Sequence, residues 1–370
     1  MAHLALIATD SWYLWNFRAA TICRLIDEGH DVLVYCGNRA YLKKLEALGA
    51  RVLYIPLHGR GVRPLVEAGN LLRLGVNLWR DRPDVVLSFN PKGNLYSGFM
   101  RYIFSFAWIA NVSGLGVLGE AQGYSGRAVD ALFRFAFHRV DHVFFQNDTD
   151  LKSWTVSKIV PLTRASRQYG SGVDLSEFAF VPAPDCKLEV VCIARLLEKK
   201  GIGEFIELAK WVRTISPEVS FCLAGALVPI EQGGYPAEKI EAAVNAGHIR
   251  FLGMLDDVRP VLAGRTVGCL LTRYKEGLPR SMIEFLATGR PILVSAFNGA
   301  IDLVPASDNG KIVDPSSAGW IVEAAEFILE IARKPGHYDA LCGNSRSLAE
   351  RRFDGNVVIK EYVSNINALL

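Results

Sequence analysis

The sequence has no long uninterrupted apolar run. Residues 95–118 come closest, but Arg101, Asn111 and several glycines break them. A membrane-crossing helix needs about 20 consecutive apolar residues, so an integral span is not expected. The N-terminus has neither a basic leader nor a small-residue cleavage site, and it predicts a buried first strand rather than a signal peptide.

Cysteine is sparse. The seven cysteines are odd in number and scattered through mostly apolar segments, which excludes a disulfide framework and a zinc-ligand spacing. They indicate reduced residues of a cytosolic protein. Asp256 and Asp257 stand in the wrong context for a metal motif at a strand end. No metal and no cofactor are predicted.

Strong charge of either sign is lacking as well. The formal net charge is +3, and no RNA-binding-type motif of stacked aromatics among Arg and Lys appears, so a nucleic-acid partner is not expected. Internal repeats and low-complexity segments are not found. Half of the 370 residues are apolar, which suits two globular domains.

Strand-like and helix-like runs alternate along the chain, a pattern typical of parallel sheets with crossover helices. One series of buried strands precedes the proline-rich stretch 181–185, and a second follows it. The expected strands are 3–9, 31–36, 51–57, 84–89, 107–112 and 142–146, then 188–194, 219–224, 249–252, 267–271 and 291–295. We predict an α/β fold of two doubly wound, Rossmann-like domains facing across a cleft. Their expected bounds are 1–180 and 181–352, with a helix in 353–370 crossing back to the first domain.

The stretch RYKEGLPRSMIEFLATG at 273–289 is the most informative part of the chain. Pro279 suits the first turn of a helix, so Glu276 is expected on the entering loop and Glu284 about one turn inside. Free N–H groups beside Gly277 would form an anion site. By spacing alone, a surface helix with two solvated glutamates explains the pattern equally well.

The letters EGLPRSMIEFLATGRPILVS closely resemble the two-glutamate signature of family 4 glycosyltransferases, which are retaining enzymes of the GT-B fold. The resemblance implies that Glu276 contacts the donor sugar and that Glu284 holds the ribose hydroxyls. It also implies that the backbone of Gly277, Leu278 and Pro279 meets the diphosphate.

Further donor-side residues follow two strands that come earlier in the second half of the chain. Arg195, Lys200 and Gly201 resemble the family's Arg-x-x-x-x-Lys-Gly element, although Lys199 stands where relatives commonly have Glu. Two cations there would stabilise a departing diphosphate. A solvated basic loop is the simpler explanation of the lysines taken alone. Gly225 ends a segment, FCLAG, that resembles the turn near the nucleotide.

The N-terminal half resembles a bacterial subgroup that extends undecaprenyl-diphosphate-linked sugars for surface glycans such as O-antigen. The similar segments are Asn16-Phe17-Arg18, Pro91-Lys92-Gly93-Asn94 and Ser113-Gly114-Leu115-Gly116. They imply that the acceptor is bound by Asn16, Arg18, Lys92, Asn94, Gly114 and Gly116.

Two basic amphipathic stretches, 60–82 and 127–139, would suit an anionic membrane surface. Burial of both apolar faces in the first domain is the simpler alternative. Together these features predict a peripheral enzyme at the inner face of the cytoplasmic membrane. It would transfer a sugar, an N-acetylhexosamine by resemblance, from a UDP-sugar to a polyprenyl-diphosphate-linked saccharide. A nucleotide-sugar epimerase of the same architecture and a non-catalytic donor-binding subunit of an assembly complex remain open.

Overall fold

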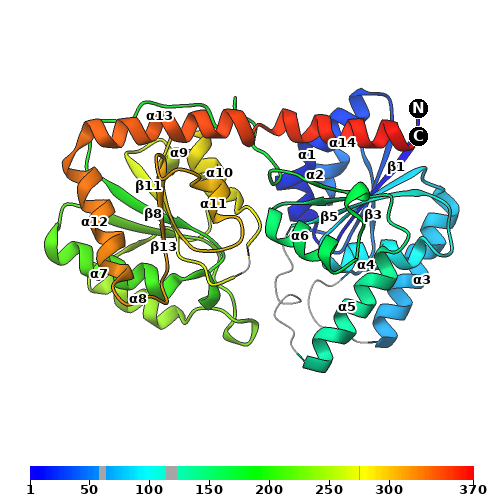
Figure 1. The fold of residues 1–370 in the computed structure, drawn as a ribbon, viewed down its shortest axis with the longest axis horizontal. Helices are drawn as coiled ribbons and strands as arrows, with labels where there is room; N and C mark the ends of the chain where they lie inside the picture. The colour runs from blue at the N-terminus through cyan, green and yellow to red at the C-terminus, as the bar shows by residue number, and fades with distance from the viewer. Residues whose placement is uncertain (58–63, 114–122, 275) are drawn as a thin grey trace. The chain divides into compact units, whose positions relative to one another are not determined.

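The computed structural model describes residues 1–57, 64–113, 123–274 and 276–370, which form two compact units (Figure 1). Unit 1 comprises Met1–Ser171 and Gly355–Leu370, and unit 2 comprises Gly172–Asp354. The first boundary therefore precedes the expected one at residue 180. The reason is that residues after Ser171 bond within unit 2: the N–H of Val173 donates to the carbonyl of Phe353 at 2.9 Å.

Unit 1 contains a parallel sheet in the order β3-β2-β1-β4-β5-β6-β7. Every strand predicted for this half is present, with ends that differ by a few residues. The strand β7 was missed because its three residues are only half-buried and show no apolar run. The strands are β1 His3–Ala8, β2 Asp31–Cys36, β3 Arg51–Tyr54, β4 Val85–Phe89, β5 Ala107–Val112, β6 His142–Phe145 and β7 Ala165–Arg167.

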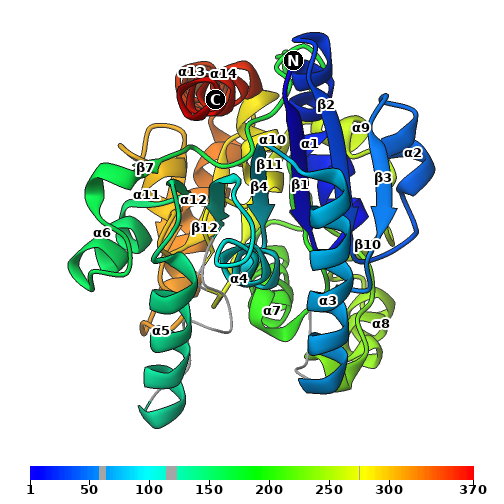
Figure 2. The same ribbon diagram turned by 90° about the vertical axis from the view of Figure 1, so that its right-hand side faces the viewer.

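Both faces of this sheet are covered, because alternate strand residues point to opposite sides. Leu4 and Leu6 join one apolar cluster and Ala5 and Ile7 the other. The helices are α1 Ser11–Asp27, α2 Leu42–Glu46, α3 Pro64–Asp81, α4 Pro91–Met100, α5 Gly123–Phe137, α6 Asp148–Val156 and α14 Gly355–Leu369. The last helix, expected near residues 356–368, belongs to unit 1 and packs on α1. Figure 2 shows β1 beside β4, and α4 against the long helices α3 and α5.

Unit 2 contains a second parallel sheet in the order β10-β9-β8-β11-β12-β13. The five predicted strands are present, and β13 is an additional edge strand that the sequence pattern did not reveal. The strands are β8 Glu189–Ile193, β9 Ser220–Ala224, β10 Arg250–Phe251, β11 Thr266–Leu270, β12 Ile292–Ser295 and β13 Gly310–Val313.

Helices cover both faces of this sheet as well. One face packs on α7, α8 and α12, and the other on α10, where the ring of Phe285 fits against Gly268. A Cβ at Gly268 would lie 2.6 Å from that ring. The helices are α7 Ile202–Ile215, α8 Ala237–Asn245, α9 Arg259–Leu262, α10 Arg280–Ala287, α11 Ala300–Leu303, α12 Trp320–Arg333 and α13 Pro335–Arg352.

In the described part of the chain, every helix is too short or too polar to cross a bilayer.

Candidate active site

The carboxyl ends of two neighbouring strands in unit 2 bring two predicted site residues together. Strands β8 and β11 pair in parallel, with Val190 opposite Val267. The loops that leave them place Nζ of Lys200 2.5 Å from Oε1 of Glu276. Ligands of such sheets bind outside the carboxyl ends of the strands. The charged pair therefore lies where a parallel α/β unit binds its ligand.

Backbone contacts hold these two loops against each other. The N–H of Arg273 donates to the carbonyl of Lys199 at 2.7 Å, and Oγ1 of Thr272 donates to the same carbonyl at 3.2 Å. Gly201 adopts a φ of +77°, and a Cβ there would lie 2.0 Å from the carbonyl oxygen of Leu271. Only glycine permits this approach, so Gly201 sets the position of Lys200.

The carboxylate of Glu276 has a second neighbour from its own loop. Oγ1 of Thr272 lies 3.4 Å from Oε1 of Glu276, and Nζ of Lys200 lies 5.9 Å from the ring centre of Tyr274. Both charged side chains are largely buried. Their attraction is therefore less screened than that of a surface pair, and the carboxylate is held in one orientation.

The turn of Gly277, Leu278 and Pro279 leads directly into α10. The N-cap residue Pro279 makes no side-chain cap bond to this helix, and the N–H groups of a first helical turn are suited to binding an anion. The turn is fixed by Gly299, whose Cβ, if present, would lie 1.7 Å from the carbonyl oxygen of Gly277. Binding of a diphosphate at this turn remains a prediction.

Glu284 lies one turn inside α10, as expected, and its side chain is 14% exposed. Burial raises the pKa of its carboxyl, and Arg280 counteracts part of that rise. Nε of Arg280 donates to Oε1 of Glu284 at 2.9 Å. Sequence reasoning missed Arg280 as the partner of this carboxylate. The signal was its i, i+4 spacing from Glu284.

The remaining donor-side residues lie at the same edge of the sheet. Arg195 follows β8, is exposed and forms no ion pair with the residues the structure describes. Gly225 follows the adjacent strand β9, and a Cβ there would lie 1.8 Å from the carbonyl oxygen of Ala194. Gly225 therefore permits close contact between the two loops, and Arg195 remains available to a ligand.

Arg18 does not have the exposed position that its predicted phosphate contact requires. Its side chain is 1% exposed, and its guanidinium lies among three rings, 4.8 Å from the centre of Phe89, 5.3 Å from Tyr362 and 5.8 Å from Tyr13. Tyr362 comes from α14, so the cation packs α1, β4 and α14 together. We correct its role from acceptor contact to packing residue.

Asn94 likewise differs from its predicted acceptor role. It is 2% exposed, its Oδ1 accepts from Ser88 at 2.7 Å and its Nδ2 donates to the carbonyl of Asn111 at 2.9 Å. Because both amide atoms are already bonded inside unit 1, Asn94 joins β4, β5 and α4 rather than facing a ligand.

Lys92 is paired within unit 1. Its Nζ lies 2.9 Å from Oε1 of Glu67 on α3, and both side chains are mostly buried. Asn16 is half-buried, and its Nδ2 donates to the carbonyl of Trp12 at 2.9 Å. Gly114 and Gly116 lie outside the described residues. Acceptor binding by Asn16 and Lys92 remains a prediction.

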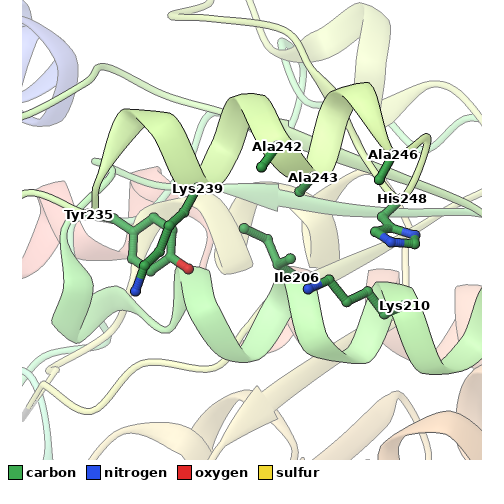
Figure 3. A pocket seen from close by; sticks show the side chains of 8 residues that line it. All are labelled: Ile206, Lys210, Tyr235, Lys239, Ala242, Ala243, Ala246 and His248. Carbon is green, nitrogen blue, oxygen red and sulfur yellow. The ribbon is translucent and has the colours of Figure 1, made fainter.

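A separate hollow of about 220 Å³ lies between α7 and α8 (Figure 3). Its floor is formed by Ile206 and alanines, with Lys210 and Lys239 on its sides. Both lysines are exposed to solvent. A metal-binding group of three or more His, Cys, Asp or Glu side chains is not found among the described residues, and metal independence remains a prediction.

The chain is similar to known glycosyltransferases. Residues 176–340 match the family model for glycosyl transferases group 1. The chain is 23% identical, over 95% of its length and 94% of the relative, to N,N'-diacetylbacillosaminyl-diphospho-undecaprenol alpha-1,3-N-acetylgalactosaminyltransferase of Campylobacter jejuni.

Solved structures of similar fold cover the whole chain. Anabaena Alr3699/HepE in complex with UDP and glucose matches with a TM-score of 0.80 at 15% identity, over 99% of this chain and 100% of that one. Sucrose-phosphate synthase of Thermosynechococcus elongatus matches with a TM-score of 0.79 at 16% identity, over 100% and 99%. The chain therefore carries a glycosyl transferases group 1 domain and has the GT-B fold.

Proposed function

We propose that the protein is a retaining glycosyltransferase of family 4 that moves an N-acetylhexosamine from a UDP-sugar to an undecaprenyl-diphosphate-linked saccharide. The contact between Lys200 and Glu276 beside the uncapped N-terminus of α10 carries the proposal. A cation and a carboxylate in contact beside a helix N-terminus are suited to binding a sugar diphosphate. The similarity to the Campylobacter transferase, which spans nearly all of both chains, supports the acceptor class.

The donor would bind with its diphosphate against the N-terminus of α10 and its ribose toward Glu284. As the bond between the anomeric carbon and the phosphate oxygen breaks, negative charge grows on the diphosphate. Lys200, Arg195 and the amides after Pro279 would stabilise that charge. Glu276 would orient the sugar hydroxyls near the anomeric carbon.

The acceptor hydroxyl would attack from the face that the leaving group vacates. A new bond forms between its oxygen and the anomeric carbon, and its proton passes to a phosphate oxygen of the leaving diphosphate. This route needs no enzymic nucleophile and keeps the anomeric configuration. No metal is part of the proposal.

A lipid-linked acceptor requires an enzyme that works at a bilayer. In this proposal, unit 1 contacts the inner face of the cytoplasmic membrane. Exposed apolar side chains follow a single stripe of α3, with Leu72 at 70% and Trp79 at 64% exposure. Arg73 and Arg80 lie on the same helix. An apolar stripe flanked by arginines matches an anionic lipid surface.

One experiment tests the reaction. The purified protein is incubated with a panel of UDP- and GDP-sugars and a short-chain polyprenyl diphosphate saccharide, and the products are identified by mass and anomeric NMR. A saccharide longer by one N-acetylhexosamine, with the donor's anomeric configuration, supports the proposal. Inverted configuration overturns the mechanism. An epimerised UDP-sugar formed without acceptor overturns the reaction.

A further inference from the structure

Asn90 has a backbone conformation that is normally reserved for glycine. Its φ is 67° and its ψ is 151°, a region that side chains with a Cβ rarely adopt. Pro91 follows it and favours an extended ψ, but proline does not force the preceding φ to be positive. Something other than local sequence preference therefore holds Asn90 in place.

The usual reason for an asparagine before a helix does not apply. Asparagine is a preferred N-cap because its side chain accepts a bond from the first turn, yet Asn90 makes no such bond with α4. Its Oδ1 instead accepts from the backbone N–H and from Oγ1 of Thr9, both at 3.3 Å. Thr9 follows β1 and Asn90 follows β4.

These contacts fix the orientation of the amide. A backbone N–H can only donate, so Oδ1 must face Thr9 and Nδ2 must face away from it. Asn90 is half-buried, and its Nδ2 has no hydrogen-bond partner among the residues the structure describes. The side chain thus has two N–H donors that form no hydrogen bond with the described residues.

The location is a place where parallel α/β sheets bind ligands. In the order β3-β2-β1-β4-β5-β6-β7, the chain reverses its winding direction between β1 and β4. Ligands of such sheets bind at that switch point, outside the carboxyl ends of the strands. Asn90 and Thr9 are the residues that leave those two strands.

We propose that the side-chain amide of Asn90 donates hydrogen bonds to an oxygen of the acceptor, either a sugar hydroxyl or a phosphate. The inference rests on the proposed function, since it assigns the acceptor to unit 1. A glycine would adopt this backbone without strain, whereas asparagine adds a side-chain amide at the cost of that strain. Thr9 holds the amide ready before the substrate arrives.

Two variants separate the amide's role from the backbone strain. Asn90→Gly relieves the strain but also removes the acceptor of both bonds from Thr9, so we expect its Tm to stay within about 4 °C of the wild-type value. We also expect its kcat/KM for the acceptor to fall about tenfold or more, because the donor groups are lost. Asn90→Asp keeps an oxygen for Thr9 but replaces Nδ2 with a second oxygen. It should retain the wild-type Tm and lose acceptor kcat/KM to a similar or greater extent.

Thr9→Val serves as the structural control, because it removes one bond to Oδ1 and leaves the amide donors in place. We expect it to lower Tm more than it lowers acceptor kcat/KM. UDP-sugar affinity, measured by calorimetry without acceptor, should stay unchanged in all three variants. A protein that binds no UDP-sugar would contradict the proposed function. Altered acceptor kinetics with unchanged UDP-sugar affinity would show that Asn90 acts on the acceptor alone.

A comparison of acceptors with and without the diphosphate shows whether Asn90 contacts a sugar hydroxyl or a phosphate oxygen. If a sugar hydroxyl accepts the bond, Asn90→Asp lowers kcat/KM equally for the acceptors with and without the diphosphate. If a phosphate accepts it, the loss is at least tenfold larger for the diphosphate acceptor. Wild-type acceptor kinetics in both Asn90 variants would overturn the inference, as would an equal loss of donor affinity.

Discussion

Nζ of Lys200 lies 2.5 Å from Oε1 of Glu276, although the two residues are 76 positions apart in the chain. The parallel pairing of β8 with β11 makes this contact possible, because both residues follow the carboxyl ends of their strands. A pair held this way can orient a sugar with one member and bind phosphate with the other.

Glu276→Gln is expected to lower kcat by about 100-fold to 1,000-fold. The amide keeps the shape of the side chain and an oxygen for Lys200, but it removes the charge that orients the donor sugar. Initial rates of sugar transfer measure the effect. Glu326→Gln, an exposed carboxylate on α12, is the matched control and should retain the wild-type rate. Full activity of the Glu276 variant would remove this residue from the mechanism.

Lys200→Met is expected to weaken UDP-sugar binding about 10-fold to 100-fold, because a charge-assisted bond to the diphosphate is lost. It also leaves Glu276 as an unpaired negative charge near the phosphates. The double variant with Glu276→Gln should therefore recover part of the lost affinity, as calorimetry can measure. Lys199→Met changes a neighbouring exposed lysine and should have little effect. If the two lysine variants behaved alike, Lys200 would have no special role.

Donor binding should depend on pH through Glu284. Burial raises the pKa of this carboxyl, so in the folded protein it takes up a proton at a higher pH than an ordinary glutamate does. A protonated carboxyl accepts fewer bonds from ribose hydroxyls, and UDP-sugar affinity should fall as the pH is lowered toward that raised pKa. UDP-sugars suit the test because their diphosphate does not titrate there.

The raised pKa of Glu284 also stabilises the folded state at low pH. The raised pKa means that the folded state binds the Glu284 proton more tightly than the unfolded chain, so this stabilisation is fully present below the unfolded pKa and is lost as the pH rises through the folded pKa. Glu284→Gln should bind UDP-sugar weakly at every pH, and its UDP-sugar affinity should change less as the pH is lowered. If the affinity of this variant fell with pH as steeply as that of the wild type, another group would cause the fall.

Gly299→Ala should destabilise the protein by about 1–3 kcal/mol and reduce transfer, because its Cβ would lie 1.7 Å from the carbonyl oxygen of Gly277. The turn that presents the amides to the diphosphate would have to move. Gly336→Ala is the matched control, since its Cβ would meet no atom within 4 Å. Urea unfolding and initial rates of both variants provide the test. Equal behaviour of the two would show that the turn is not rigid.

Trp79→Glu should reduce binding to vesicles that contain anionic phosphatidylglycerol, measured by co-sedimentation. The substitution places a charge of the wrong sign in the apolar stripe of α3. Trp211→Glu is the control, because Trp211 is also exposed but lies on α7 in unit 2. Equal binding of wild-type protein and the Trp79 variant would argue against α3 as the membrane surface.

The parallel strands and the α10 motif were predictable because their signals are local. Strands such as Leu4–Ala8 are buried on both faces of a sheet, so their residues form an uninterrupted apolar run in the sequence. The strand β13 was missed because GKIV is short and contains a lysine. Glu276, Lys200 and Glu284 were predicted as site residues because their loops resemble a known signature, and their roles stay predictions.

The sequence by itself determined the α/β class, the two series of strands and the loop-to-helix turn at Gly277, since each depends on residues close together in the chain. Only the tertiary structure decided that Arg18 and Asn94 are buried, that Lys92 is paired with Glu67 and that Asn90 holds a positive φ. The physical reason is that burial and pairing depend on neighbours from distant segments. Tyr362 on α14 packs over Arg18 on α1, and no local pattern encodes that contact.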